Sequence, residues 1–252
     1  ASAVMSDVID LARGVRMPTF GQPATSLVTP TPAAAATPAP HYLRMTLLDK
    51  PGADQSVIFA GQLIPPRATP DEAAIELMND VLGGQFTSRL NMNLREDKHW
   101  SYGARSFAYD ARGQRPFLAY APVQTDKTAE SIAEIRKEFA ELVGKRPATP
   151  EEVTMVKRTN TLSLPGQWET GGAVLGSVSQ IVQFGLPDDY WNNYAATIRG
   201  VTPEQVNKAA QDHLRPEDLV MVVVGDRQVI EPKLKGLGFE SIQLINADGE
   251  LL

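Results

Sequence analysis

Residues 82–103 read LGGQFTSRLNMNLREDKHWSYG and form the densest local pattern in this 252-residue sequence. Gly83 and Gly84 predict a turn, because adjacent glycines stop the helical spacing of the apolar residues before them. A short helix is predicted over residues 88–97, and a strand over residues 101–110. Arg95 and Tyr102 therefore lie on either side of a helix-to-strand junction. Helical spacing alone does not bring their side chains together.

The elements around this stretch follow an order that predicts the fold class. Thr69-Pro-Asp-Glu72 is typical of a capping box, which would begin the helix that ends at the two glycines. Thr149-Pro-Glu-Glu152 is a second capping box, and Thr202-Pro-Glu-Gln205 would begin a further helix. The other strands are predicted at 42–49, 56–64, 115–123, 219–224 and 241–245, and the first two are joined by a Pro-Gly turn. The other helices are predicted at 128–143, 149–164, 169–184, 188–198 and 202–214. This order predicts an α+β sandwich, in which a mixed, mainly antiparallel sheet packs against a layer of helices.

The N-terminal region differs in composition from the rest. Residues 22–40 contain five prolines in nineteen positions, which favours an extended linker or strap. Residues 1–16 are interpreted as the end of a helix that belongs to something upstream. We therefore predict two parts: residues 1–40, a helix remnant with a Pro/Ala-rich linker strap, and residues 41–252, a single α+β domain.

Composition excludes several function classes. The sequence has 24 Lys and Arg against 30 Asp and Glu, a formal net charge of −6. This acidity and the lack of a basic stripe argue against binding to nucleic acid. With no cysteine, the chain cannot form a disulfide framework or a thiolate metal site. No run approaches the roughly 20 apolar residues that a transmembrane helix needs.

The residues alone show no complete catalytic apparatus. His41, His99 and His213 are far apart, and none belongs to a pair of histidines spaced to bind zinc on one helical face. Phosphate-binding, dinucleotide-binding and serine-hydrolase motifs are absent. Without further information, Arg95 is expected to pair with a neighbouring carboxylate, and Tyr102 to be an ordinary strand residue.

An ordered series of motifs changes this interpretation. The series is Leu82-Gly83-Gly84, Ser88-Arg89-Leu90, Leu94-Arg95-Glu96, Ser101-Tyr102-Gly103, Val123-Gln124-Thr125, Leu164-Pro165-Gly166 and Val222 to Asp226. In this order, over residues 42–252, it resembles the non-zinc C-terminal domain of the insulinase/pitrilysin zinc metallopeptidases, which include the mitochondrial processing peptidases. One departure is His99, which stands where the family usually has glycine. It is expected to affect the turn that positions Tyr102.

The resemblance implies a metallopeptidase half-domain of the LuxS/processing-peptidase type and a division of labour. Two halves would enclose a chamber, and the other half would bind zinc through an inverted histidine motif that this chain lacks. Arg95 and Tyr102 match the family's substrate-carbonyl and oxyanion donors, and Gly83, Gly84 and Ser88 would contribute to substrate binding. No metal is expected on this chain. Its expected partners are a zinc-bearing domain or subunit and peptide substrates, and a periplasmic setting is implied by resemblance alone.

Two alternatives to the peptidase role remain open from the sequence. The chain could be a scaffold or assembly subunit that keeps the fold without catalysis, which the strap and His99 favour. It could instead be a stand-alone peptide-binding module. Whether the zinc half is covalently linked to this chain also stays open.

Overall fold

The computed structural model describes residues 44–239, 241–246 and 248–252. The predicted helix remnant and strap at residues 1–40 lie outside the described residues, so this division of the chain stays a prediction. Among the residues that are described, no helix combines the length and the apolar character needed to cross a bilayer.

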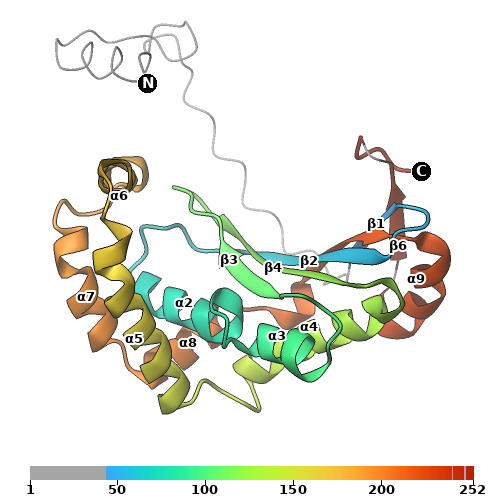
Figure 1. Cartoon of the computed structure of the whole chain (residues 1–252), viewed down its shortest axis with the longest axis horizontal. Helices are drawn as coiled ribbons and strands as arrows, with labels where there is room; N and C mark the ends of the chain where they lie inside the picture. The colour runs from blue at the N-terminus through green and yellow to red at the C-terminus, as the bar shows by residue number, and fades with distance from the viewer. Residues whose placement is uncertain (1–43, 240, 247) are drawn as a thin grey trace, which may run out of the picture. The chain divides into compact units, whose positions relative to one another are not determined.

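The described residues form one six-stranded mixed sheet in the order β3-β4-β2-β5-β1-β6 (Figure 1). The strands are β1 (Arg44–Asp49), β2 (Gln55–Ile64), β3 (Arg105–Ala108), β4 (Arg115–Gln124), β5 (Val220–Gly225) and β6 (Ser241–Ile245). Strand β1 runs parallel to β5 and β6, and the other three pairings are antiparallel. The predicted α+β class and the mixed, mainly antiparallel sheet are therefore confirmed. The predicted turn joins β1 to β2, but β5 lies between these two strands.

Helices cover one face of this sheet. The helices α2 (Glu72–Asn79), α4 (Thr128–Val143) and α9 (Arg227–Leu234) contact strands, and α8 (Pro203–His213) packs against α2 and α4. The helices α5 (Pro150–Gln167), α6 (Gly171–Phe184) and α7 (Tyr190–Gly200) form the left end of the domain in Figure 1. Completely buried side chains join the sheet to the helices, among them Ile58, Phe117, Met221, Ile132 and Phe139.

The second face of the sheet stays accessible. Along β4, side chains alternate between buried and partly exposed, as expected where only one face is covered. Phe117 and Ala119 belong to the buried set, whereas Leu118, Tyr120 and Pro122 are half-buried. The half-buried set is apolar and aromatic, so this face can contact a ligand or another protein surface.

Three elements differ from the sequence prediction. The predicted helix over 88–97 is split into the short α3 (Arg89–Asn91) and the π-helical segment η4 (Met92–Asp97). Of the strand predicted over 101–110, only β3 is formed. Residues 98–104 instead form a loop, which is held by hydrogen bonds to η4, α3 and β4. Helix α9 has no counterpart among the predicted elements.

One predicted helix cap is wrong, and two are confirmed. Capping boxes begin α5 at Thr149 and α8 at Thr202. At α2, however, the residue before the helix is Asp71, and no side chain caps the helix. The Glu72 carboxylate accepts hydrogen bonds from the guanidinium groups of Arg67 and Arg115 instead. A charge-assisted pair with two buried guanidinium groups outcompetes a bond to one backbone amide.

Candidate active-site surface

The loop from Lys98 to Ala104 determines where Arg95 and Tyr102 lie. The carbonyl of Leu94 accepts hydrogen bonds from the amides of both Trp100 (3.0 Å) and Ser101 (3.3 Å). These bonds end η4 and turn the chain toward the sheet. Arg95 therefore lies in the last turn of a helical segment, and Tyr102 lies seven residues later in a loop beside β4.

His99 has the backbone conformation that glycine adopts most readily. Its φ of 58° is the only positive φ of a non-glycine residue within the described part of the chain. Histidine is among the residues that reach this region more often than most, at a cost of about 1–2 kcal/mol relative to ordinary backbone. Its Nδ1–H donates to the carbonyl of Arg95 at 3.1 Å, which offsets part of that cost. The glycine-like turn therefore persists although the glycine is absent.

The backbone on both sides of Tyr102 is held by hydrogen bonds. The Ser101 hydroxyl donates to the carbonyl of Pro122 at 2.6 Å, and Ser101 also forms a β-bridge with Val123. On the other side, the amide of Ala104 donates to the Asn91 side chain at 3.2 Å. The Tyr102 side chain is nevertheless 85% exposed, and it makes no hydrogen bond to any described residue. A fixed backbone thus presents a free phenol to solvent.

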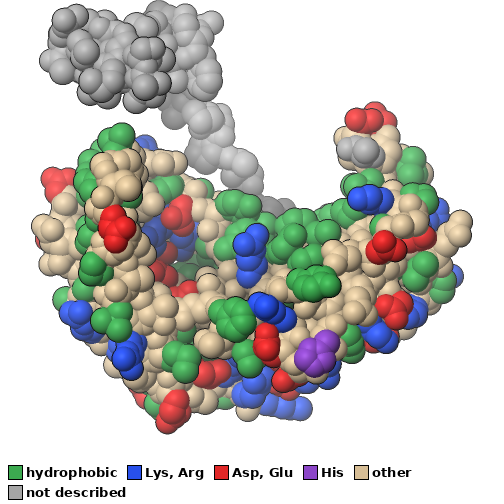
Figure 2. Space-filling model, in the orientation of Figure 1, with side chains coloured by type: hydrophobic (Ala, Val, Ile, Leu, Met, Phe, Trp, Pro, Cys, Tyr) green, Lys and Arg blue, Asp and Glu red, His purple; other side chains and the backbone are tan. Residues whose placement is uncertain are grey.

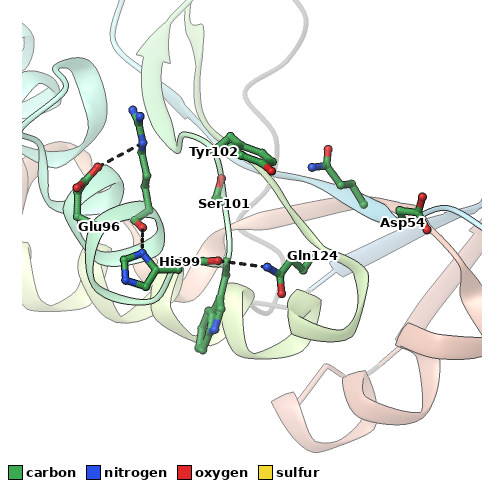
Figure 3. A pocket seen from close by; sticks show the side chains of 9 residues that line it. Asp54, Glu96, His99, Ser101, Tyr102 and Gln124 are labelled. Atoms are coloured by element: carbon green, nitrogen blue, oxygen red, sulfur yellow. Dashed lines mark hydrogen bonds and ion pairs between the residues drawn. The ribbon is translucent and has the colours of Figure 1, made fainter.

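Arg95 and Tyr102 line the same cavity, which has a volume of about 440 Å³ and is named here the Arg95 cavity. Figure 3 shows labelled side chains around it, including Asp54, His99 and Gln124. The structure therefore brings together two residues that helical spacing could not place side by side. Both are hydrogen-bond donors, and a peptide carbonyl is the kind of acceptor that they fit.

The Arg95 guanidinium is only loosely engaged. Its Nε lies 3.3 Å from a Glu96 carboxylate oxygen, and both side chains are about 40% exposed. The guanidinium carbon also lies 4.8 Å from the ring centroid of Phe86. The pairing with a neighbouring carboxylate that the residues alone suggested is thus present. An exposed pair of this kind contributes at most about 1 kcal/mol, so a substrate can displace it.

Gly83 and Gly84 line a second cavity of about 520 Å³, which Tyr102 also borders. This second hollow is named here the Arg105 cavity, after a cation in its wall. Neither glycine has a positive φ, and the requirement for glycine is close packing. A Cβ atom on Gly83 would collide with the amide of Ser106, and one on Gly84 with the Asp80 carboxylate.

Ser88 lies elsewhere. It directly precedes α3, is 3% exposed, and lines neither of the two cavities beside Tyr102. Its buried hydroxyl finds no hydrogen-bond partner among the residues that the structure describes. A role of Ser88 in substrate binding stays a prediction, and the burial gives this residue no direct access to the surface.

A polar cluster around Asp80 packs against the diglycine turn, and the sequence interpretation did not predict it. The Asp80 carboxylate accepts a hydrogen bond from Asn160 at 2.7 Å, and the Gln85 side chain donates to Asn160 at 3.2 Å. Burial raises the pKa of Asp80 to about 6, although the hydrogen bonds from Asn160 and Gln85 lower it. The only sequence signal was an aspartate between the apolar residues of α2 and the glycines.

Arg89, in the Ser-Arg-Leu motif, has a structural role. Its Nε and Nη2 donate to the two carboxylate oxygens of Glu152 at 2.8 and 2.7 Å. The guanidinium also donates to the carbonyls of Arg146 and Pro147. This bidentate pair connects α3 to the start of α5, and the Arg89 side chain is only 4% exposed. Arg89 is therefore unavailable to a ligand.

The part of the chain that is described offers no zinc site. No three of its His, Cys, Asp or Glu side chains are grouped as metal ligands would be. The arrangement beside Tyr102 consists of hydrogen-bond donors on a concave surface. Such a surface can bind a carbonyl or a developing oxyanion.

A comparison with known families identifies the class of protein. Residues 18–160 match the family model described as the peptidase M16 inactive domain. The chain belongs to this family, which confirms the predicted non-zinc domain of the insulinase family.

Solved structures agree with this assignment. A peptidase M16 inactive domain from Pseudomonas fluorescens is 25% identical, with a TM-score of 0.68, over 73% of this chain and 44% of its own chain. An inactive peptidase domain from Bordetella parapertussis is 15% identical, with a TM-score of 0.59, over 67% of this chain and 91% of its own. The periplasmic protease PqqL from Escherichia coli is 16% identical, with a TM-score of 0.60, over 79% of this chain and 22% of its own.

The chain thus spans less than half the length of the Pseudomonas structure and less than a quarter of the length of the Escherichia coli protease. No curated protein sequence matches the chain significantly.

Proposed function

We propose that this chain is the non-zinc domain of a zinc metalloendopeptidase, in which Arg95 and Tyr102 bind the substrate carbonyl and stabilise the oxyanion during peptide hydrolysis. The observation that carries the proposal is that both residues line one cavity, each with a donor group available. Membership of the inactive-domain family supports it, because such a domain needs a partner to form a complete site.

The chemistry of the donors fits this role. Zinc in the partner would activate water for attack on the scissile carbonyl. The Tyr102 hydroxyl and the Arg95 guanidinium would donate hydrogen bonds to the carbonyl oxygen, and these bonds would strengthen as negative charge develops on it. A donor fixed in this way commonly stabilises a transition state by about 3–4 kcal/mol. The bonds that hold the backbone of Tyr102 reduce the reorganisation needed at that moment.

The two glycines would assist substrate binding indirectly. Gly83 and Gly84 line the hollow beside Tyr102, and their close packing against Ser106 and Asp80 holds this part of its wall in place. Ser88 would contribute only by starting α3, since its hydroxyl is buried.

A partner domain is supported by an uncovered apolar surface on α6. Val174, Leu175, Val178 and Val182 of this helix are between 45% and 71% exposed. Three of them are four residues apart, so they form one stripe along the helix. Exposed stripes of this kind mark protein interfaces. We assign the stripe to a partner domain, because the chain spans only 44% of the Pseudomonas structure that it resembles.

The accessible face of the sheet supports an enclosed binding chamber. The half-buried β4 residues Leu118 and Tyr120 would form part of its wall, and an unfolded peptide offers apolar side chains to match them. We extend the proposal to a periplasmic setting on the likeness to the periplasmic protease alone.

The test is peptide hydrolysis by the chain together with its zinc-bearing partner. The isolated chain should be inactive, and the reconstituted pair active. Tyr102→Phe should lower kcat about 10²-fold, because it removes one donor to the oxyanion. Tyr109→Phe is the matched control: Tyr109 is also an exposed tyrosine, at 57%, and it lines neither cavity beside Tyr102.

Two other results would contradict parts of this proposal. Unchanged kcat in the Tyr102→Phe variant would remove Tyr102 from the mechanism. An assembled, zinc-loaded pair without hydrolysis would favour the inactive scaffold instead.

A further inference from the structure

Among the described residues, the exposed cation Arg105 has no carboxylate partner. It is the first residue of β3, where its backbone pairs with β4, and its side chain forms no ion pair or hydrogen bond with any other described residue. Its guanidinium carbon lies 5.2 Å from the ring centroid of Tyr120 and 5.9 Å from that of Phe107. Cation–π contacts with two rings restrict the side chain while leaving its N–H donors free. The guanidinium is therefore oriented in advance for an anionic ligand.

The hollow beside this cation is lined mainly by apolar groups. Besides Arg105, the walls of the Arg105 cavity include Phe86, Tyr120 and Pro122, and the two glycines of the turn also line it. Figure 2 shows this region, where Lys or Arg side chains (blue) lie beside hydrophobic side chains (green) over β3 and β4. An apolar hollow with one unpaired guanidinium fits a ligand group that has an aliphatic stem and a terminal carboxylate.

Tyr102 connects this hollow to the donor pair. Its side chain lines both the Arg95 cavity and the Arg105 cavity. A peptide in extended conformation advances about 3.3 Å per residue, and its successive side chains point to opposite sides. A carbonyl held by Tyr102 would therefore have a neighbouring side chain within reach of the Arg105 cavity.

We propose that the Arg105 cavity binds a carboxylate of the substrate peptide close to the scissile bond, with Arg105 as the specificity-determining residue. This proposal rests on the proposed function, because it assumes that a peptide lies against Tyr102. The carboxylate can come from a Glu or Asp side chain or from the C-terminus of the peptide. Both present the same planar group to the guanidinium.

Peptide binding to the full 252-residue chain tests this proposal without requiring hydrolysis. The probes are fluorescent Ala/Phe nonapeptides with an amidated C-terminus, in which one Glu, or one Gln in the matched set, occupies each position in turn. A third set carries Gln and a free C-terminal carboxylate. Kd is measured by fluorescence anisotropy at low and at high salt.

The wild-type chain should bind the best carboxylate peptide about tenfold more tightly than its Gln counterpart at low salt, as expected for one charge-assisted hydrogen-bonded pair. High salt should reduce the preference, because the site is open to solvent. Preference for the Glu set assigns the carboxylate to a side chain, and preference for the free-carboxylate set assigns it to the C-terminus.

Two variants and a control identify the residue responsible. Arg105→Gln should abolish the preference and leave the Kd of the Gln peptides unchanged. Arg105→Glu should reverse it, so that peptides with Lys in place of Glu bind more tightly. Arg158→Gln, at an exposed position of α5 outside the cavity, should keep the wild-type preference.

Failure of this proposal differs from failure of the proposed function. Equal affinity for the Glu, Gln and free-carboxylate peptides, or a preference that survives Arg105→Gln, would overturn the role of Arg105 and leave peptide binding intact. A wild-type chain that binds none of the peptides would contradict the proposed function and this proposal with it.

Discussion

Two buried arginines of this domain, Arg67 and Arg115, have an environment opposite to that of Arg95. Arg67 and Arg115 are at most 8% exposed and share the carboxylates of Glu72 and Asp110. Arg115 also donates to the carbonyl of Pro65 at 3.0 Å. Arg95, in contrast, has one loose ion pair and is about 40% exposed.

The difference separates arginines that hold the fold from one that is available to a ligand. A buried guanidinium with several acceptors cannot bind substrate unless those bonds break, which leaves buried carboxylates unpaired. A half-exposed guanidinium can exchange a weak partner for a substrate at little cost. The environment of an arginine, rather than its residue type, therefore marks it as a candidate site residue.

The largest expected effect on stability comes from Arg115→Gln. The substitution removes a cation from the buried Glu72 carboxylate and from the partly exposed Asp110 carboxylate, so the free energy of unfolding should fall by about 3–5 kcal/mol. Urea denaturation followed by circular dichroism measures it. Arg95→Gln is the control, and it should change the free energy of unfolding by less than about 0.5 kcal/mol. Similar losses in the two variants would contradict the division drawn here.

A smaller, pH-dependent effect is expected at Asp80, beneath the diglycine turn. Its pKa is about 6 in the folded chain against an ordinary value of 3.8, so between these pH values the folded state binds more protons than the unfolded state. The stability that this group contributes is therefore greatest below about pH 4 and is lost as pH rises to about 6. The loss is on the order of 3 kcal/mol.

Asp80→Asn should remove this part of the pH dependence. The unfolding free energy of the wild-type chain should fall relative to that of the variant between pH 4 and pH 6 in urea titrations. Asp126→Asn, at a side chain 61% exposed, is the control and should keep the wild-type profile. Parallel profiles for the wild type and Asp80→Asn would show that Asp80 titrates alike in both states.

The smallest effect concerns His99, whose conformation connects the two donor residues. His99→Gly should be more stable than His99→Ala by about 1 kcal/mol, because only glycine adopts a positive φ without strain. Both variants lose the hydrogen bond to the carbonyl of Arg95, so their comparison isolates the backbone term. Thermal unfolding of both variants measures the difference. Equal stability would mean that the turn is not strained.

Much of the fold could be predicted from local pattern. The apolar, β-branched run over residues 219–224 predicted β5. The capping boxes at Thr149 and Thr202 predicted the starts of α5 and α8. The prediction failed where distant partners compete with local rules. Glu72 was predicted to cap a helix, but Arg67 and Arg115 bind it across the fold.

The candidate site shows the same limit. The motif order selected Arg95, Tyr102, Ser88 and the two glycines, and four of these five residues line the cavities beside Tyr102. Ser88 does not, because the motif records the start of a helix as readily as a contact surface. Asp80, Asn160 and Arg105 were missed, since nothing in their immediate sequence shows that Asp80 and Asn160 meet in a cluster or that Arg105 is left without a partner.

The sequence by itself determined the family and the α+β class and selected the two candidate donors, because residue order and periodicity are properties of the chain alone. The tertiary structure decided which cations remain available and which are enclosed by carboxylates. It also placed Tyr102 between two hollows. Those features depend on contacts between residues far apart in sequence, where burial and competing partners set the strength of each interaction.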